Sequence, residues 1–194
     1  MSRPPIYFLR HGETDYNAAG RLQGRLDVPL NAKGRGQATR NGGVLAELID
    51  DPSAMHYVAS PLLRTRQTMQ IARGCLKLPE TPFDVDDRLL EISFGRWEGK
   101  VWDDIKRDDA EAYRIRQTDG YNHAVPEGES YAMVMARVES WLADVTLPTV
   151  VVAHGGIMRC LRGHVLGLPP EAMLQLTVPQ DKVMLIEGGA VRLL

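Results

Sequence analysis

The chain has 194 residues but only two cysteines, Cys75 and Cys160, which are too few for a disulfide framework. We therefore expect both to be reduced thiols in a cytoplasmic protein. The net charge is only −2, so no overall field attracts nucleic acid or an anionic membrane, and any anion must bind at a local cluster of basic groups. No apolar run approaches the roughly 20 residues of a membrane span, and the N-terminus lacks a signal-peptide core, so we expect the mature protein to begin near Met1.

Short apolar runs alternate with helix-like segments, which favours an α/β fold with a mainly parallel sheet. The predicted strands are 6–9, 57–59, 83–85 and 149–153, followed by a hairpin of 182–186 and 190–194. One helix is predicted over 32–50, with Asn31 as its cap and the Gly42-Gly43 pair as a weak point. Two more helices are predicted to open at Ser60-Pro61 and at His154.

The length suits a single domain, 1–194. The segment 97–130 is less regular and rich in charge, and it lies between predicted core strands. We interpret it as a cap-like excursion that covers one edge of the sheet.

Three predicted strands end in residues suited to binding an anion. Arg10 and His11 follow the first, Ser60 with Arg64 follows the second, and His154 follows the fourth. Ligands of parallel sheets bind beyond the carboxyl ends of the strands, so these residues are expected at one edge. The loop that follows His11 adds further donors for a tetrahedral oxyanion such as phosphate: Asn17, Gln23 and Gly24.

Carboxylates and metal ligands are less clearly marked. Glu91 follows a Leu-Leu pair and is a candidate acid–base group at the rim of the same cleft, with Glu98 as its competitor. His11 and His154 could both be metal ligands, but no third histidine or close carboxylate pair stands at ligand spacing. We therefore expect no metal.

At this point four segments resemble a known family. "RHGET" at 10–14, "SPLLRTRQT" at 60–68, "LLEISFGRWEG" at 89–99 and "AHGG" at 153–156 are similar to the signatures of the histidine phosphatase superfamily, branch 1. That branch includes cofactor-dependent phosphoglycerate mutases and α-ribazole phosphatases. The resemblance covers nearly the whole chain, in order. It implies a three-layer α/β/α sandwich with a small cap inserted after the third core strand.

The resemblance also implies roles for individual residues. His11 would attack the phosphoryl group and become a phosphohistidine. Arg10, Arg64 and His154 would bind the phosphoryl oxygens with Asn17 assisting, and Glu91 would protonate the leaving oxygen. Two nearby arginines should lower the pKa of His11 and keep it neutral. No metal or organic cofactor would be needed.

The favoured function is hydrolysis of a small phosphorylated metabolite. A cofactor-dependent mutase and a non-catalytic phosphate-ligand binder are the alternatives. Arg114 and Arg116 are two apart, so at most one should face the pocket from a helix. The sequence leaves open the substrate and the choice between monomer and homodimer, and the tentative substrate contacts are Arg25, Trp97, Trp102, Arg114, Arg116, Tyr121 and His123.

Overall fold

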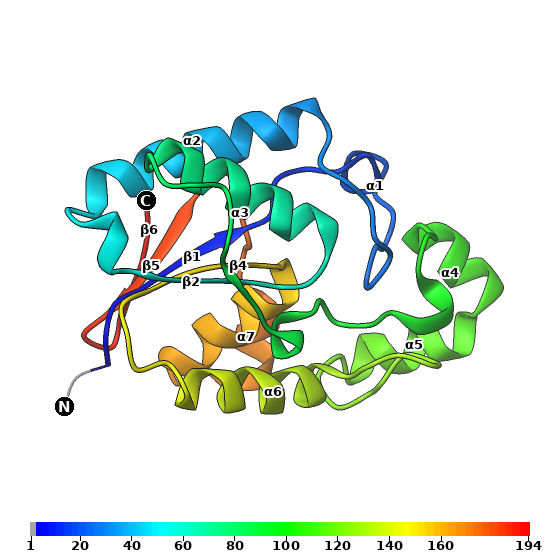
Figure 1. Cartoon of the computed structure of the whole chain (residues 1–194). Coiled ribbons are helices and arrows are strands. Elements are labelled where there is room, and N and C mark those ends of the chain that lie inside the picture. Colours follow the sequence, from blue (N-terminus) through cyan, green and yellow to red (C-terminus); the bar gives the residue numbers. More distant parts are fainter. Residues whose placement is uncertain (1–2) are drawn as a thin grey trace.

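The computed structural model describes residues 3–194 and has one six-stranded sheet in the order β3-β2-β4-β1-β5-β6 (Figure 1). The first four strands in that order are mutually parallel, and β5 and β6 form an antiparallel hairpin beside β1. The sheet is therefore mainly parallel, as predicted. The strands are β1 (Ile6–Arg10), β2 (His56–Ala59), β3 (Asp84–Val85), β4 (Thr149–Ala153), β5 (Val183–Glu187) and β6 (Ala190–Leu193).

Helices cover both faces of this sheet, which confirms the three-layer α/β/α architecture. α2 (Ala32–Leu48) and α3 (Leu63–Cys75) lie over one face, and α6 (Tyr131–Ala143) and α7 (Gly155–Val165) lie under the other (Figure 1). The shorter elements are α1 (Asp15–Ala18), η1 (Pro52–Ala54), η2 (Asp87–Leu89), η3 (Gly95–Trp97), α4 (Trp102–Asp108), α5 (Ala110–Thr118) and α8 (Pro170–Leu174).

The central strands are apolar on both sides because both faces are covered. In β1, Ile6 and Phe8 pack in the core between the sheet and helices α6 and α7. Tyr7 and Leu9 pack in the other core, between the sheet and helices α2 and α3. All five residues of β4 are buried. Two separate cores therefore hold the sheet rigidly between the helix layers.

The Gly42-Gly43 pair, predicted to weaken α2, allows this helix to pack closely against α3. The helix runs unbroken through Gly42 and Gly43 and ends at Leu48. A Cβ atom at Gly42 would lie 2.8 Å from Cys75 Sγ and 3.0 Å from Ala72 Cα. Glycine thus weakens the helix locally but allows α2 and α3 to approach closely.

Two sequence-based boundaries were wrong. α3 begins at Leu63 with Leu62 as its N-cap, so Pro61 lies outside the helix instead of in its first turn. The Leu63 amide instead donates to Asp27 Oδ1 at 2.6 Å. The strand expected at 83–85 is only two residues long and its side chains are exposed, because β3 lies at the edge of the sheet.

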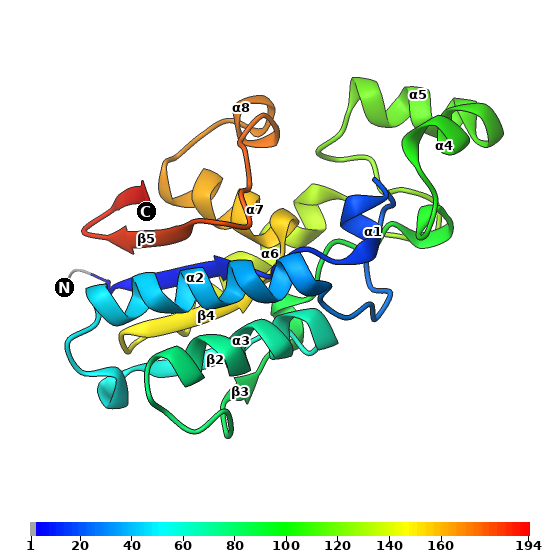
Figure 2. The same cartoon turned by 90° about the horizontal axis from the view of Figure 1, so that it is seen from above.

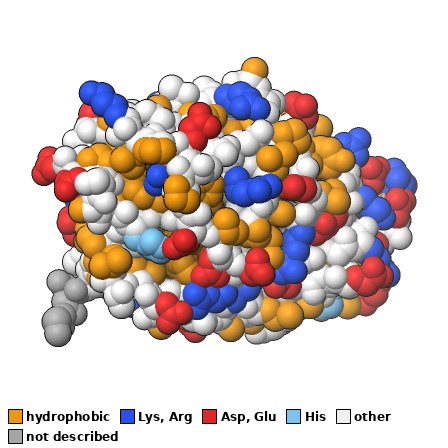
Figure 3. All heavy atoms as spheres, viewed as in Figure 1, with side chains coloured by type: hydrophobic (Ala, Val, Ile, Leu, Met, Phe, Trp, Pro, Cys, Tyr) orange, Lys and Arg blue, Asp and Glu red, His pale blue; other side chains and the backbone are white. Residues whose placement is uncertain are grey.

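The segment after β3 carries α4 and α5 beyond the carboxyl ends of β1 and β4, near α1 (Figure 2). It has a small apolar core of its own, made of Trp97, Ile105 and Val125. On the face that Figure 3 shows, basic and acidic side chains are interspersed. Across residues 3–194, no helix has the length and apolar character needed to cross a membrane.

Candidate active site

The register of the parallel strands brings together the carboxyl ends of β1, β2 and β4, which are followed by His11, Ser60 and His154. The His11 amide donates to Ala153 O and the Ser60 amide donates to Val152 O, both at 3.0 Å. β1, β4 and β2 therefore end at nearly the same level, and the rings of His11 and His154 meet edge to face with centroids 5.1 Å apart.

A cavity of about 350 Å³ lies at this edge, and it carries most of the residues predicted for the phosphate site. It also contains one of the tentative substrate contacts, Trp102. The predicted residues on its wall are Arg10, His11, Asn17, Gln23, Gly24, Arg64, Glu91 and Trp102.

His11 is held as a neutral imidazole in one tautomer. Its Nδ1 lies 2.7 Å from Gly12 O, so Nδ1 carries the hydrogen and donates it to this carbonyl. Arg64 Nε donates to His11 Nε2 at 3.3 Å, so Nε2 presents a lone pair. Burial, followed by the charges of Arg64 and Arg10, lowers the pKa of His11 well below its usual value. The arginines act as expected, but burial is the larger cause.

The two arginines beside His11 are themselves anchored by backbone carbonyls. Arg64 is fully buried, and its two Nη atoms donate to Gly24 O and Leu26 O, each at 2.7 Å. Burial lowers the pKa of Arg64 to about 10, which leaves it charged at neutral pH. Arg10 Nη1 donates to Val178 O at 2.5 Å, and its buried Nε has no partner among the described residues. This Nε is therefore a free donor beside the candidate nucleophile.

His154 lies behind His11 and not on the cavity wall. It is the N-cap residue of α7 and has no exposed surface. Its Nε2 lies 2.7 Å from Ser60 Oγ, and its buried Nδ1 has no partner within residues 3–194. Burial and the neighbouring Arg64 charge lower its pKa well below the usual value, so the ring is neutral.

Glu91 lies against the N-terminus of α7. Its Oε1 accepts from the amides of Gly156 and Ile92, each at 3.0 Å. A Cβ at position 156 would lie 2.4 Å from this oxygen, so glycine leaves room for the carboxylate in its present position. Glu98, its competitor in the sequence, does not line the cavity and instead accepts from the backbone amides of Arg25 and Phe94. Of the two carboxylates, only Glu91 therefore lies on the cavity wall.

Asn17 and Gln23 line the cavity, and their side-chain carbonyl oxygens are engaged within the protein. Asn17 Oδ1 accepts from Thr14 N and from Gln180 Nε2, both at 3.2 Å. Gln23 Oε1 accepts from Thr14 Oγ1 at 2.8 Å. Because both carbonyl oxygens are occupied, the NH₂ groups are the ends left for an anion.

Six of the seven tentative substrate contacts do not line this cavity. Trp97 is fully buried and donates from Nε1 to Asp109 Oδ2 at 2.7 Å, because it forms the centre of the small apolar core. Arg25 forms an ion pair with Glu129 at 3.0 Å. Tyr121 lines two other hollows. The burial of Trp97 contradicts its prediction as a substrate contact. The other five do not line this cavity either and stay predictions as substrate contacts: Arg25, Tyr121, His123, Arg114 and Arg116.

Sequence reasoning missed Arg159, Tyr131 and Phe94, which all line the cavity. Arg159 Nη1 donates to the Tyr131 hydroxyl at 2.6 Å. A signal was available for Arg159, because it lies near the start of the helix that follows β4, as Arg64 lies near the start of the helix that follows β2.

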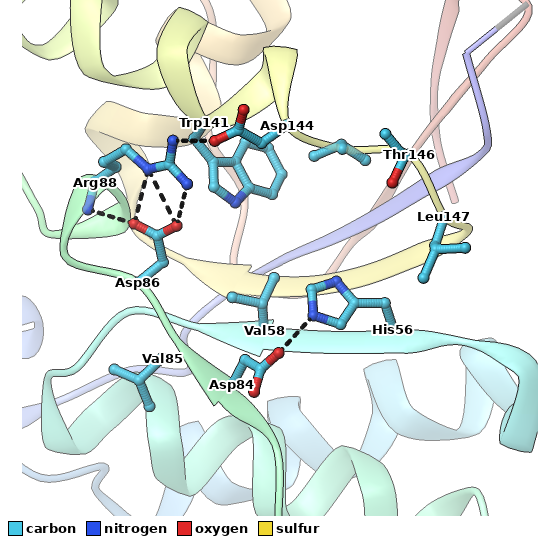
Figure 4. Close-up of a pocket in the computed structure, with 11 residues that line it drawn as sticks. His56, Val58, Asp84, Val85, Asp86, Arg88, Trp141, Asp144, Thr146 and Leu147 are labelled. Carbon is cyan, nitrogen blue, oxygen red and sulfur yellow. Dashed lines mark hydrogen bonds and ion pairs between the residues drawn. The ribbon is translucent and has the colours of Figure 1, made fainter.

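Another cavity of about 370 Å³ lies between β2, β3 and the end of α6 (Figure 4). Its charged side chains pair with one another: His56 Nε2 lies 2.8 Å from Asp84 Oδ2, and Arg88 contacts Asp86 at 2.7 Å and Asp144 at 2.6 Å. These charges are compensated, whereas those around His11 are not. The cavity around His11 is therefore the candidate active site. Within residues 3–194, no three His, Cys, Asp or Glu side chains gather as a metal site, and the absence of a metal requirement stays a prediction.

The fold and this site define an enzyme of the phosphatase class. The chain belongs to the histidine phosphatase superfamily (branch 1), whose sequence profile matches residues 6–191. The chain is 35% identical over 191 residues to a protein named "Probable phosphoglycerate mutase GpmB" from Enterobacter sp. (strain 638), covering 94% of this chain and 84% of that protein.

Solved structures in the same family resemble the whole chain. A putative alpha-ribazole-5'-P phosphatase from Escherichia coli superposes with a TM-score of 0.83 at 29% identity, covering 98% of this chain and 94% of that one. A mycobacterial glucosyl-3-phosphoglycerate phosphatase superposes with a TM-score of 0.80 at 29% identity, covering 98% and 96% of the two chains.

Proposed function

We propose that the protein is a metal-independent phosphomonoester hydrolase that acts through a phosphohistidine on a small phosphorylated metabolite. The observation that carries this proposal is the state of His11. Its Nδ1 donates to Gly12 O, so the Nε2 nitrogen keeps its lone pair, which meets only a long contact of 3.3 Å from Arg64 Nε at the cavity. We place the enzyme in the cytoplasm, as a monomer or homodimer.

In the first step, the Nε2 lone pair of His11 forms a bond to phosphorus and the ester P–O bond breaks. The leaving oxygen takes a proton from the Glu91 carboxyl and departs as an alcohol. A covalent intermediate divides a difficult reaction into two easier ones.

In the second step, the Glu91 carboxylate takes a proton from a water molecule whose oxygen attacks phosphorus. The N–P bond breaks, the electron pair returns to Nε2, and inorganic phosphate leaves. The carboxyl group is protonated again, so the cycle is closed.

Charge stabilisation supplies most of the catalysis in phosphoryl transfer. The free Nε of Arg10, the Arg64 guanidinium and the N-terminus of α7 all lie at the cavity. Because these groups are buried, their attraction for the phosphoryl oxygens is weakly screened.

A phosphoglycerate mutase is the second candidate, and the name of the 35% identical relative favours it. A mutase of this type keeps its phosphoryl group and returns it to the substrate. Its activity would depend on 2,3-bisphosphoglycerate, whereas hydrolysis would not, so turnover with and without this compound separates the two.

The test is turnover of p-nitrophenyl phosphate in EDTA by the wild type, His11→Ala and His164→Ala. His164 is an exposed histidine that pairs with Glu139, so its variant is a matched control. We expect EDTA-resistant turnover in the wild type and the control, its loss in His11→Ala, and an acid-labile phosphoenzyme with labelled substrate. Activity lost in EDTA or kept without His11 would overturn the mechanism, and phosphate binding without turnover would favour a non-catalytic binder.

A further inference from the structure

A largely buried ion pair lies behind the segment 88–93, which carries Glu91 and is the Glu91 loop. The pair consists of Glu129, just before α6, and Arg137 within that helix. Arg137 Nη2 lies 3.2 Å from Glu129 Oε2, and Arg137 Nε lies 3.3 Å from Glu129 Oε1. Neither side chain lines the cavity around His11, so the pair has no direct access to a ligand there.

The ion pair holds the Glu91 loop at both ends. At its start, Arg137 Nη1 donates to Arg88 O at 2.6 Å. At its end, the Ser93 amide donates to Glu129 Oε2 at 3.0 Å, and the Glu129 amide donates to Ser93 O at 2.9 Å. The backbone is therefore fixed three residues before Glu91 and two residues after it.

Between these two anchors the chain has little freedom. Ile92 is only 1% exposed and packs in the core under the sheet. Glu91 itself reaches the N-terminus of α7, where its Oε1 accepts from the Gly156 amide at 3.0 Å. The place of this carboxyl group on the cavity wall thus depends on a short loop whose ends are held by the ion pair.

The burial and the geometry of the pair favour a role in positioning. Its side chains are 13% and 15% exposed, and in every other ion pair of residues 3–194 at least one partner is more exposed than that. Burying two charges costs desolvation energy, so such a pair adds little net stability over an apolar contact. The three guanidinium nitrogens of Arg137 each bind a different acceptor, and this planar fork fixes directions that an apolar contact cannot. Arg25 also pairs with Glu129, but it is largely exposed and the contact is screened.

We propose that Glu129 and Arg137 are positioning residues that hold the Glu91 carboxyl at the leaving oxygen of the substrate. They act through the backbone of the Glu91 loop and touch no reacting atom. This inference rests on the proposed hydrolase function and extends it to the residues that align its acid.

The test compares kcat/KM for an alkyl phosphate, whose leaving group needs a proton, with kcat/KM for p-nitrophenyl phosphate, whose leaving group does not. Glu129→Gln keeps the shape of the side chain and removes its charge, whereas Arg137→Lys keeps the charge and removes the fork. Asp109→Asn is the matched control, because Asp109 is 16% exposed and pairs with Arg96 outside the Glu91 loop. Glu129→Gln and Asp109→Asn are also each combined with Glu91→Gln.

We expect Glu129→Gln and Arg137→Lys to lower kcat/KM for the alkyl phosphate by about 10- to 100-fold, because a misplacement of about 1 Å can cost that much. The loss for p-nitrophenyl phosphate should be clearly smaller. In the Glu91→Gln background, Glu129→Gln should cause no further loss, because residues that act as a unit are not additive. Asp109→Asn should affect both substrates equally and add its effect to that of Glu91→Gln.

Two results would overturn the proposal. One is an equal loss for both substrates in Glu129→Gln, and the other is a loss of undiminished size when Glu91 is already replaced. Either would mean that the pair supports the fold in general. If Glu129→Gln does not fold, Arg137→Lys, alone and with Glu91→Gln, decides by the same two comparisons.

If the wild type hydrolyses neither substrate, the hydrolase function has failed independently. Hydrogen exchange of the Gly156 amide then tests the positioning role without activity. This amide lies in the first turn of α7, where it has no acceptor within the helix, and it donates to Glu91. Faster exchange in Glu129→Gln, but not in Asp109→Asn, would support the proposal, and unchanged exchange would refute it.

Discussion

Arg64 connects His11, the candidate nucleophile, to the loop around Gly24 that forms part of the cavity wall. Its Nε lies 3.3 Å from His11 Nε2, while its Nη atoms donate to Gly24 O and Leu26 O. A planar guanidinium makes all three contacts at once, and an ammonium group cannot reproduce this fork.

Arg64→Lys should therefore lower kcat/KM for p-nitrophenyl phosphate by about 10²- to 10³-fold, although the charge is kept. The loop carbonyls also lose their donors, so the melting temperature should fall. Arg66 is an exposed arginine in the same helix, and Arg66→Lys is the control that should alter neither value. Near-normal activity in Arg64→Lys would mean that charge alone matters.

Glu91→Gln separates the acid step from phosphoryl binding. An alkyl alcohol is a poor leaving group that needs a proton, whereas p-nitrophenolate leaves without one. We expect kcat for alkyl phosphates to fall by about 10²- to 10⁴-fold, with a clearly smaller loss for p-nitrophenyl phosphate. Glu98→Gln is the matched control, because that carboxylate binds loop amides, and any loss should be equal for both substrates. Equal losses in Glu91→Gln would contradict its role as acid.

Stability should fall as the pH drops below about 6.5. His11 and His154 are buried and their pKa values lie well below 6.5, so the unfolded chain binds protons that the native state does not. Stability is therefore fully present above the unfolded value of about 6.5 and is lost towards the lower folded values. Each histidine should contribute a slope of about 1.4 kcal/mol per pH unit.

Urea unfolding between pH 6 and pH 5 measures this slope. The wild type should lose about 1.4 kcal/mol per pH unit more than His11→Gln, and the His11→Gln/His154→Gln double variant should be flatter still. Background carboxylates titrate in all three proteins and cancel in the comparison. A wild-type slope equal to that of the double variant would show that the native histidines are charged.

Ser60 should fix the tautomer of His154. The two side chains are hydrogen-bonded at 2.7 Å, and the neutral ring carries one hydrogen. If the hydroxyl donates to Nε2, the hydrogen is on Nδ1, a buried donor with no partner among the described residues. Ser60→Ala should produce a mixture of tautomers by ¹⁵N NMR and lower kcat several-fold. A wild-type ring protonated only at Nε2 would rule out this arrangement.

The mainly parallel sheet and most of the phosphate cavity were predictable because both depend on local patterns. Buried parallel strands read as apolar runs, and their carboxyl ends converge whatever the loops do. Arg10, His11 and Arg64 stand within a few residues of such ends. Their placement therefore follows from the strand assignment, even though α3 starts two residues later than predicted.

The segment after β3, which carries α4 and α5, was less predictable because tertiary packing decides where its side chains lie. Trp97 was expected to face the ligand, but it forms an apolar core with Ile105 and Val125. Arg116 and Arg114 have the same residue type in the same helix, and only the rings of Phe94 and Tyr131 decide which one turns inward. No local sequence pattern contains that information.

Arg116→Met should stabilise the protein without ligand. Methionine keeps the length of the side chain and removes a buried charge that has no partner among the described residues, so a gain of about 1–3 kcal/mol is expected. For a chain of this size, that corresponds to a rise in the melting temperature of roughly 2–4 °C per kcal/mol. Arg114→Met, which breaks only an exposed pair, should change stability by less than about 1 kcal/mol. If Arg116→Met instead destabilises the ligand-free protein as much as a core truncation does, Arg116 is a packing residue whose charge is compensated within the chain.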